Sequence, residues 1–282
     1  MTAYVLDTGI RKTHSEFEGR ATDGYDFIDN DADANDCHGH GTHVAGTIGA
    51  LDNTVGVVGM APGARIWPVR VLDNRGSGTY SAIVCGIDYV TAHADEIEVA
   101  NMSLGGSGSD SACGSNKDAM HEAICRSVSA GVTYVVAAGN SAANSSTFVP
   151  ATYEEVITVS ALADFNGLPG GGAAATCRTD VDDTFASFSN FGPKMQMNGR
   201  DILFSEDPTP GQIGGWIKLW NDRANAALQH LRTTPAAPLT PDIVVQNARS
   251  VGQFCGIQPC FLAIRDRACN LKSGEVPAIA GL

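Results

Sequence analysis

The sequence predicts an α/β fold of three layers, in which helices cover both faces of a mainly parallel central sheet. Two observations carry this prediction. Short apolar runs rich in Val and Ile alternate with segments of helical spacing, and this alternation is typical of a parallel sheet. The 32 glycines indicate tight turns and close approaches between elements. We expect the fold to be incomplete at both ends of the chain.

Five strands and three helices are expected in order along the chain. The strands are residues 3–6, 66–71, 98–102, 133–137 and 156–159, and the helices are about 41–50, 80–94 and 117–130. Met1 stands directly before the first strand, without the basic and apolar segments of a signal peptide. We therefore expect the chain to begin part-way through a longer one.

Polar and glycine-rich segments follow three of the expected strands. Asp7, residues 101–105, and the pair Gly139 and Asn140 stand at their carboxyl ends. Ligands of open parallel sheets bind at this edge, so we expect the functional site there.

The composition changes near residue 193. Residues 1–193 hold 9 Lys and Arg against 24 Asp and Glu, a net charge of −15, whereas residues 194–282 hold 9 against 7, a net charge of +2. Gly falls from 24 to 8 across the same boundary. We therefore treat 1–193 as one partial domain. Residues 194–282 stay unassigned, with one amphipathic helix expected at about 213–232.

The charge of the whole chain narrows its partners. A formal net charge of −13 argues against nucleic acid and anionic membranes, because like charges repel. No apolar run reaches the length of a membrane span. We expect a monomer that binds neither.

The eight cysteines leave two interpretations open. Cys113 and Cys125 bracket a loop and a helical segment, and they form either a disulfide or two free thiols. The spacing of Cys255, Cys260 and Cys269 matches no zinc pattern. We therefore expect no metal site.

Three histidines stand close together in DCHGHGTHVAGTIGA, residues 36–50. His38 and His40, or His40 and His43, have spacings that would share an ion. A zinc site needs a third protein ligand and neighbouring polar groups that orient the ligands, and the surrounding glycines provide neither. The general-base interpretation fits better, because Asp7 offers an orienting carboxylate and Asn140 offers a donor to a developing oxyanion.

These pieces resemble the subtilisin-like serine proteases, and in particular their proteinase K-like and bacterial extracellular branches. The matching blocks are DTGI at 7–10, HGHGTHVAG at 38–46, NMSLGG at 101–106, VAAGN at 136–140 and SFSNFG at 187–192. They occur in the order of the family and cover about residues 2–193. The resemblance implies a serine endopeptidase, extracellular by family, that needs no cofactor for its chemistry.

The resemblance also implies roles for individual residues. His40 matches the general base, Asp7 the carboxylate that holds its tautomer, and Asn140 the oxyanion donor. His43 matches a buried structural histidine, and His38 is expected to be merely exposed.

An extended peptide would be the substrate, bound as an added strand. Two segments resemble the edges of the substrate groove and one resembles a wall of the primary specificity pocket: Gly76, Ser77 and Gly78; Ser103, Leu104 and Gly105; and Ala137, Ala138 and Gly139. No charged residue is evident in that wall, so apolar or aromatic side chains are the expected occupants.

Structural calcium is left open. The run from Asp23 to Asp36 holds six Asp but lacks the Gly and final Glu of a helix–loop–helix site, so a solvated loop is favoured. A site seen in family members would use carbonyls near Glu154 and Val156, and Gln196 stands where its Asp would fall.

The nucleophile of the family is missing. Its Gly-Thr-Ser-Met-Ala block should follow SFSNFG, but the corresponding window 209–220 reads TPGQIGGWIKLW. The serines after 193 are Ser205, Ser250 and Ser273. None has small residues packed around it, as a serine that enters a buried helix needs, and Cys255 is a poor replacement. We expect a shortened or frame-disrupted protease that is inactive as it stands. The alternatives are a pseudoprotease that binds peptides and an active enzyme with an unrecognised nucleophile.

Overall fold

A six-stranded sheet forms the centre of the computed structural model, which describes residues 2–192, apart from 23, 98, 116, 167–171 and 177, and the backbone of 196, 197, 200 and 201. All pairs in this sheet are parallel. Its strands, in spatial order, are β2 (Tyr25–Asp26), β3 (Arg65–Arg70), β1 (Thr2–Asp7), β4 (Val99–Met102), β6 (Thr133–Ala137) and β8 (Ile157–Val159).

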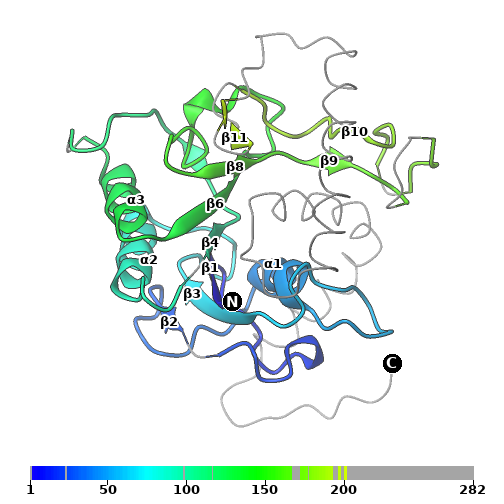
Figure 1. The fold of residues 1–282 in the computed structure, drawn as a ribbon, viewed down its shortest axis with the longest axis horizontal. Helices are drawn as coiled ribbons and strands as arrows, with labels where there is room; N and C mark the ends of the chain where they lie inside the picture. Colours follow the sequence, from blue (N-terminus) through cyan, green and yellow to red (C-terminus); the bar gives the residue numbers. More distant parts are fainter. Residues whose placement is uncertain are drawn as a thin grey trace.

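Helices lie on both faces of the sheet, which gives the three expected layers (Figure 1). Helix α1 (His40–Gly49) covers one face, and α2 (Tyr80–Ala92) and α3 (Ala119–Ser129) pack together on the other. The predicted fold class is confirmed. The predicted bounds of the strands and helices differ from these by no more than two residues.

Alternating side chains of β1 supply the two cores. Tyr4 and Leu6 belong to the cluster that packs under α2 and α3, whereas Val5 belongs to the cluster under α1. All three are fully buried. Successive side chains of a strand point to opposite faces, so one short apolar strand anchors both helical layers.

The two outer helices begin at side-chain caps. Thr79 accepts a hydrogen bond from the backbone N–H of Ala82 at the start of α2, and Asp118 accepts from Met120 and His121 at the start of α3. Such caps satisfy backbone donors that a helix start leaves free. Helix α1 has no side-chain cap, and Gly39 precedes it with φ +100°.

Several small elements were not predicted. They are the edge strand β2 of the central sheet, the 3-10 turns η1 (Ser15–Phe17) and η2 (Ser145–Thr147), and the antiparallel pairs β5 (Gly106–Ser107) with β7 (Phe148–Val149), β9 (Leu162–Ala163) with β10 (Thr184–Phe185), and β11 (Gln196–Met197) with β12 (Arg200–Asp201). Two-residue strands carry no periodicity that a sequence pattern can detect.

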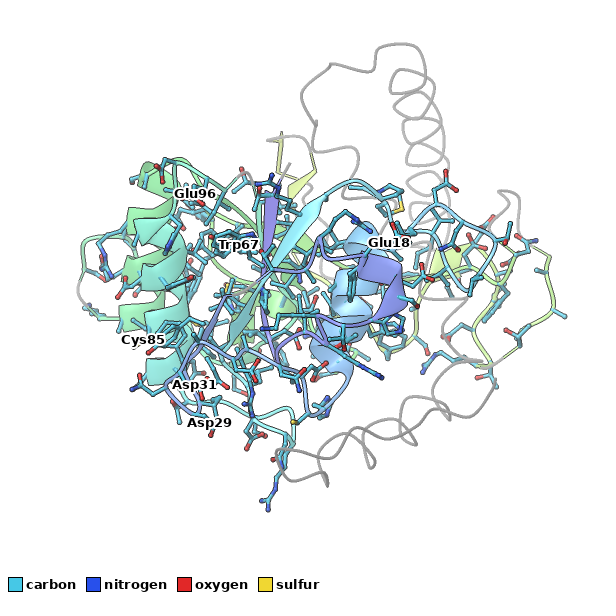
Figure 2. All side chains as sticks on the ribbon, turned by 90° about the horizontal axis from the view of Figure 1, so that it is seen from below. Glu18, Asp29, Asp31, Trp67, Cys85 and Glu96 are labelled. Atoms are coloured by element: carbon cyan, nitrogen blue, oxygen red, sulfur yellow. A yellow bond between two sulfur atoms is a disulfide. The ribbon has the colours of Figure 1, made fainter. Side chains whose placement is uncertain are left out.

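The acidic run 23–36 is not a wholly solvated loop, which corrects the prediction. Asp29 and Asp31 lie at its surface (Figure 2). Asp26, by contrast, is buried in β2 and pairs with the guanidinium of Arg70 at 2.5 Å. Asp36 is also buried. Burial of a carboxylate requires such partners, so these two positions stabilise the fold.

Most of the remaining predictions about chain organisation concern residues outside the described part of the chain. The helix expected at about 213–232 and the rest of 202–282 lie outside the described residues. Among the helices that are described, none combines the length and the apolar character needed to cross a bilayer.

Candidate active site

Asp7 and His40 meet at the carboxyl end of the central strand. Oδ1 of Asp7, the last residue of β1, lies 2.7 Å from Nδ1 of His40, the first residue of α1. The Asp7 side chain is fully buried, whereas the imidazole is 44% exposed. A buried carboxylate therefore holds one ring nitrogen of a histidine whose ring still reaches solvent.

Glycine at position 41 allows this approach. Its backbone N–H donates to Oγ1 of Thr8 at 2.9 Å. A Cβ added at Gly41 would lie 2.2 Å from the carbonyl oxygen of Gly9 and 3.1 Å from Oδ1 of Asp7. Any other residue would push α1 away from the end of β1 and would separate the imidazole from its carboxylate.

Asp36 fixes the loop that leads into α1, a role that the sequence analysis missed. Its carboxylate accepts hydrogen bonds from Oγ1 of Thr8 and from the backbone N–H groups of His38, Gly39 and Thr42, at 2.8–2.9 Å. The hydroxyl of Thr42 also donates to it, at 2.6 Å, so five donors from both sides of His40 converge on one buried side chain. The available signal was a carboxylate four residues before His40.

The pKa values of His40 and His43 are shifted in opposite directions. The hydrogen bond to Asp7 raises the pKa of His40 above its ordinary value, and this effect outweighs burial, which lowers it. Burial, together with the charge of His40, lowers the pKa of His43 to about 4. His43 is half-buried rather than buried as expected, and it stays neutral near pH 7.

His38 is not merely exposed, which corrects a second prediction. The side chain is half-buried, and its Nδ1 accepts from the backbone N–H of His40 at 3.3 Å. A Cβ at Gly76 would lie 3.2 Å from its Nε2. His38 therefore stands between the His40 backbone and the first of the expected groove segments.

Asn140 lies in an exposed turn three residues beyond β6. β6 pairs with β4, and β4 pairs with β1, all in parallel. The turn that carries Asn140 and the end of β1 that carries Asp7 are therefore at the same edge of the sheet.

Asn190 holds that turn in place, and the sequence analysis gave it no role. Its Oδ1 accepts from the backbone N–H groups of Ser141 and Ala143, and its Nδ2 donates to the carbonyl of Ala138 at 2.9 Å. The side chain is fully buried. The signal was its place in the SFSNFG block, which packs against VAAGN.

The expected groove segments also lie at this edge. Gly76, Ser77 and Gly78 are exposed in the loop after β3, and residues 103–105 follow β4 directly. Oδ1 of Asp73 accepts from the backbone N–H groups of Arg75 and Ser77, which closes the first loop. Ala137 ends β6, where Ala138 is buried and Gly139 has φ +106°.

The nucleophile candidates cannot be placed on this framework. Ser205, Ser250, Ser273, Cys255 and the window 209–220 all lie outside the described residues.

Comparisons with known proteins point to one family. The model of the Subtilase family matches residues 3–237, which continues past the compositional boundary at 193. Alkaline serine exoprotease A of Vibrio alginolyticus is 42% identical over 192 residues, and an extracellular serine proteinase of a Thermus species is 43% identical over 240 residues. Subtilisin DY of Bacillus licheniformis is 37% identical over 196 residues.

A solved structure, a cold-adapted subtilisin-like serine proteinase, matches with a TM-score of 0.57 and 34% identity, covering 88% of this chain and 81% of that one. The sequence matches cover 68%, 83% and 68% of this chain but only 30%, 51% and 61% of the three relatives. The family match itself spans most of the chain. The chain belongs to the subtilase family, peptidase family S8.

Proposed function

We propose that residues 2–192 carry the acid–base half of a serine endopeptidase site and the groove that binds its peptide substrate. The observation that carries this proposal is the 2.7 Å contact between Nδ1 of His40 and Oδ1 of Asp7. It is supported by the placement of Asn140 and the groove segments at the same edge of the sheet.

The proposed chemistry assigns one task to each residue. Asp7 accepts the Nδ1–H of His40 and fixes the tautomer in which Nε2 is free of its proton. Nε2 takes the proton of a serine hydroxyl as that oxygen attacks the peptide carbonyl, and later gives it to the leaving amine. The Asn140 amide donates to the oxyanion of the tetrahedral intermediate. No step needs a metal or a cofactor.

The proposed chemistry needs a nucleophilic serine. The printed sequence contains no Gly-Thr-Ser-Met-Ala block, so we propose that this chain alone does not turn over peptides. In subtilisin, loss of the nucleophilic serine lowers kcat by about 10⁶. The oxyanion donor and the groove then leave about 10³-fold acceleration over water.

A second function, peptide binding without cleavage, is favoured by the groove segments. They are present and ordered by Asp73 and Asn190 although the nucleophile block is missing. Substrate binding by strand addition uses backbone groups, so it does not need the serine. We propose an extended peptide with an apolar or aromatic side chain as the ligand.

A fluorophosphonate probe with a matched peptide-binding assay separates these functions. We expect no labelling of the purified full chain, together with saturable binding of an extended apolar peptide. Labelling that disappears in His40→Ala would instead establish an active serine. The proposed site would be contradicted by a chain whose circular dichroism shows the folded state but which neither takes up the probe nor binds the peptide.

The proposals for the location of the protein and for structural calcium rest on its family. The Thermus relative is named an extracellular proteinase, and we propose secretion for this chain as well, as a monomer. Structural calcium near Glu154 and Val156 stays a prediction, testable by the dependence of melting temperature on added calcium.

A further inference from the structure

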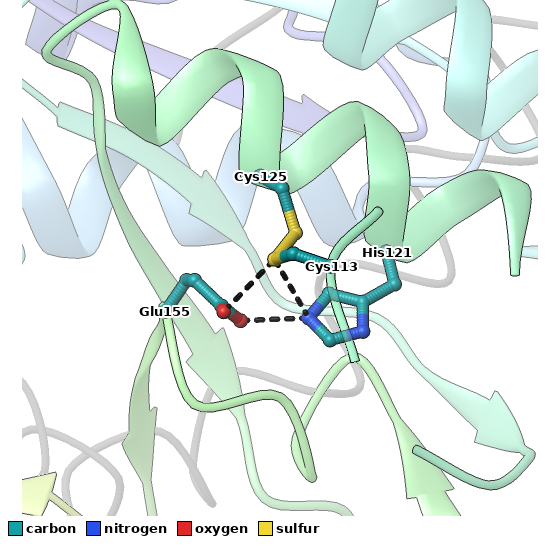
Figure 3. Close-up of side chains that lie close together, drawn as sticks. All are labelled: Cys113, His121, Cys125 and Glu155. Atoms are coloured by element: carbon teal, nitrogen blue, oxygen red, sulfur yellow. Dashed lines mark hydrogen bonds and ion pairs between the residues drawn. A yellow bond between two sulfur atoms is a disulfide. The ribbon is translucent and has the colours of Figure 1, made fainter. Parts of the chain in front are cut away.

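A cluster of four potential metal ligands lies around α3, on the face of the sheet opposite to α1. It consists of Cys113, His121, Cys125 and Glu155 (Figure 3), whose ligand atoms all lie within 4.8 Å of one another. Cys113 and Cys125 are joined by a disulfide. This cluster takes no part in the proposed peptidase site, and no metal site was expected from the sequence.

The four residues come from three segments that converge on one point. His121 and Cys125 are one turn apart on α3, so their side chains share a face of that helix. Cys113 belongs to the loop between β5 and α3, and Glu155 comes just before β8. Figure 3 shows the imidazole and the carboxylate directed at the Cys113 sulfur.

The contacts within the cluster are unusual for a disulfide. Sγ of Cys113 lies 3.0 Å from Oε1 of Glu155 and 3.8 Å from Nε2 of His121. Neither a disulfide sulfur nor an ionised carboxylate carries a hydrogen, so the first contact is no hydrogen bond. Nε2 of His121 lies 2.7 Å from Oε2 of Glu155. That last contact is an ion pair, so a sulfur, a nitrogen and the two oxygens of one carboxylate lie against one another.

These separations are close to those of a tetrahedral zinc site. Zn–S bonds of about 2.3 Å and Zn–N or Zn–O bonds of about 2.0–2.2 Å place ligand atoms about 3.3–3.8 Å apart. The three contacts deviate from that range by less than 1 Å. Only the two sulfurs must separate, which follows when the bond between them is broken.

Two side chains lie against the imidazole of His121. Its Nδ1 lies 3.2 Å from Oδ1 of Asp110, an ion-pair distance without the geometry of a hydrogen bond, and its ring stacks on Tyr153 at 4.0 Å with an interplanar angle of 3°. The side chain is buried. A hydrogen bond from Nδ1 to this nearby carboxylate would fix the tautomer of His121 and raise its basicity as a metal ligand.

Tyr153, the stacking partner of His121, is itself held by a hydrogen bond. The hydroxyl of Tyr153 donates to Oδ2 of Asp118, whose Oδ1 caps the start of α3. The stacking partner of His121 is thereby tied to the helix that carries both His121 and Cys125. Cys113 is exposed, which leaves a path for an ion from solvent.

We propose that reduction of the Cys113–Cys125 disulfide converts this cluster into a zinc site with Cys113, Cys125, His121 and Glu155 as ligands. A dithiol reductant gives two electrons and two protons to the disulfide and leaves as its own disulfide. Zn²⁺ then displaces both thiol protons and binds two thiolates, a neutral imidazole and a carboxylate. Disulfide and zinc are alternative links between the same three segments.

Metal titration of the full chain tests the proposal. The six other cysteines, Cys37, Cys85, Cys177, Cys255, Cys260 and Cys269, are first replaced by Ser, so that only one pair of thiols is left. The reduced protein is titrated anaerobically with Co²⁺ and then with Zn²⁺. We expect one ion per chain, thiolate-to-cobalt charge-transfer bands, and protection of both thiols from alkylation. The oxidised protein should show none of these.

Single substitutions identify the ligands and their support. His121→Asn and Glu155→Gln should each weaken zinc binding at least tenfold, and Asp110→Asn about 10–100-fold. His93→Asn, a half-buried histidine outside the cluster, is the matched control and should leave the affinity unchanged.

Three results would overturn the proposal. The first is a reduced, folded chain that binds no ion. The second is uptake that His121→Asn leaves unaltered. The third is a reduced chain that loses its helical circular dichroism and does not regain it when zinc is added.

Discussion

An added Cβ at Gly41 would lie only 2.2 Å from the carbonyl oxygen of Gly9, so α1 meets the turn after β1 backbone to backbone. The same helix contains Gly46, where an added Cβ would meet nothing within 4 Å. The two glycines make a matched pair, since both are helical and only one is in contact.

Gly41→Ala should lower the free energy of unfolding by about 3 kcal/mol or more, because neither backbone can yield without moving α1. Gly46→Ala should raise it by about 0.5–1 kcal/mol, because Ala favours a helix interior over Gly. Urea unfolding of both variants measures the difference. Equal effects would show that the close contact does not determine where α1 lies.

The proton affinity of His40 should depend on Asp7. The hydrogen bond to Asp7 raises the pKa of His40 above 6.5, so its charged form persists to higher pH in the folded chain. Asp7→Asn should lower that pKa, because an amide stabilises the imidazolium less than a carboxylate does. NMR titration of the His40 ring protons gives the value directly. Asp73→Asn, in the groove loop, serves as the control and should leave it unchanged.

His43 should make the fold sensitive to acid. Its pKa is lowered to about 4 in the folded state, against an ordinary value of 6.5. Between these two values the unfolded chain binds more protons than the folded chain, so stability is lost as pH falls from about 6.5 toward 4.

His43→Asn cannot be protonated at this position, so it should reduce the loss of stability between pH 6.5 and 4. Thermal unfolding recorded at a series of pH values measures this loss. His14 has its pKa lowered in the same direction and remains in both proteins, so the difference between them isolates His43. An unchanged slope would mean that His43 titrates alike in both states.

Asn190 should stabilise the turn that carries Asn140. Asn190→Ala leaves two partly buried backbone donors and the buried carbonyl of Ala138 without partners, at a cost of about 3 kcal/mol. Asn190→Asp keeps the acceptor for Ser141 and Ala143 but buries a charge and sets a carboxylate oxygen against the carbonyl oxygen of Ala138, so it should also destabilise the fold. The exposed Asn74→Ala should change stability by less than about 0.5 kcal/mol. Thermal and urea unfolding rank the three variants.

The Arg70–Asp26 pair should matter far more than a surface pair. The Arg70 side chain is 10% exposed and that of Asp26 1%. Arg70→Met leaves a buried carboxylate unpaired and should cost about 3–5 kcal/mol.

Arg126→Met is the matched comparison, because Arg126 and Asp88 are 56% and 52% exposed. Its cost should stay below about 1 kcal/mol. Similar losses in unfolding free energy for both variants would contradict the structural weight given to Asp26.

The sequence by itself determined the layered α/β fold, the order of its main elements and the family. Apolar periodicity is a local property that strands such as β6 and helices such as α2 carry within their own residues. The family blocks are equally local, and they single out Asp7, His40 and Asn140 without reference to the rest of the chain.

Only the tertiary structure decided which polar side chains are buried and what they hold. Asp26 and Asp36 lie in one acidic run that reads as solvated, yet each meets partners from segments distant in sequence. Asn190, and the cluster of Cys113, His121, Cys125 and Glu155, likewise depend on contacts between separate segments. A sequence pattern records spacing along the chain, whereas burial and ligand geometry arise from how the chain packs in space.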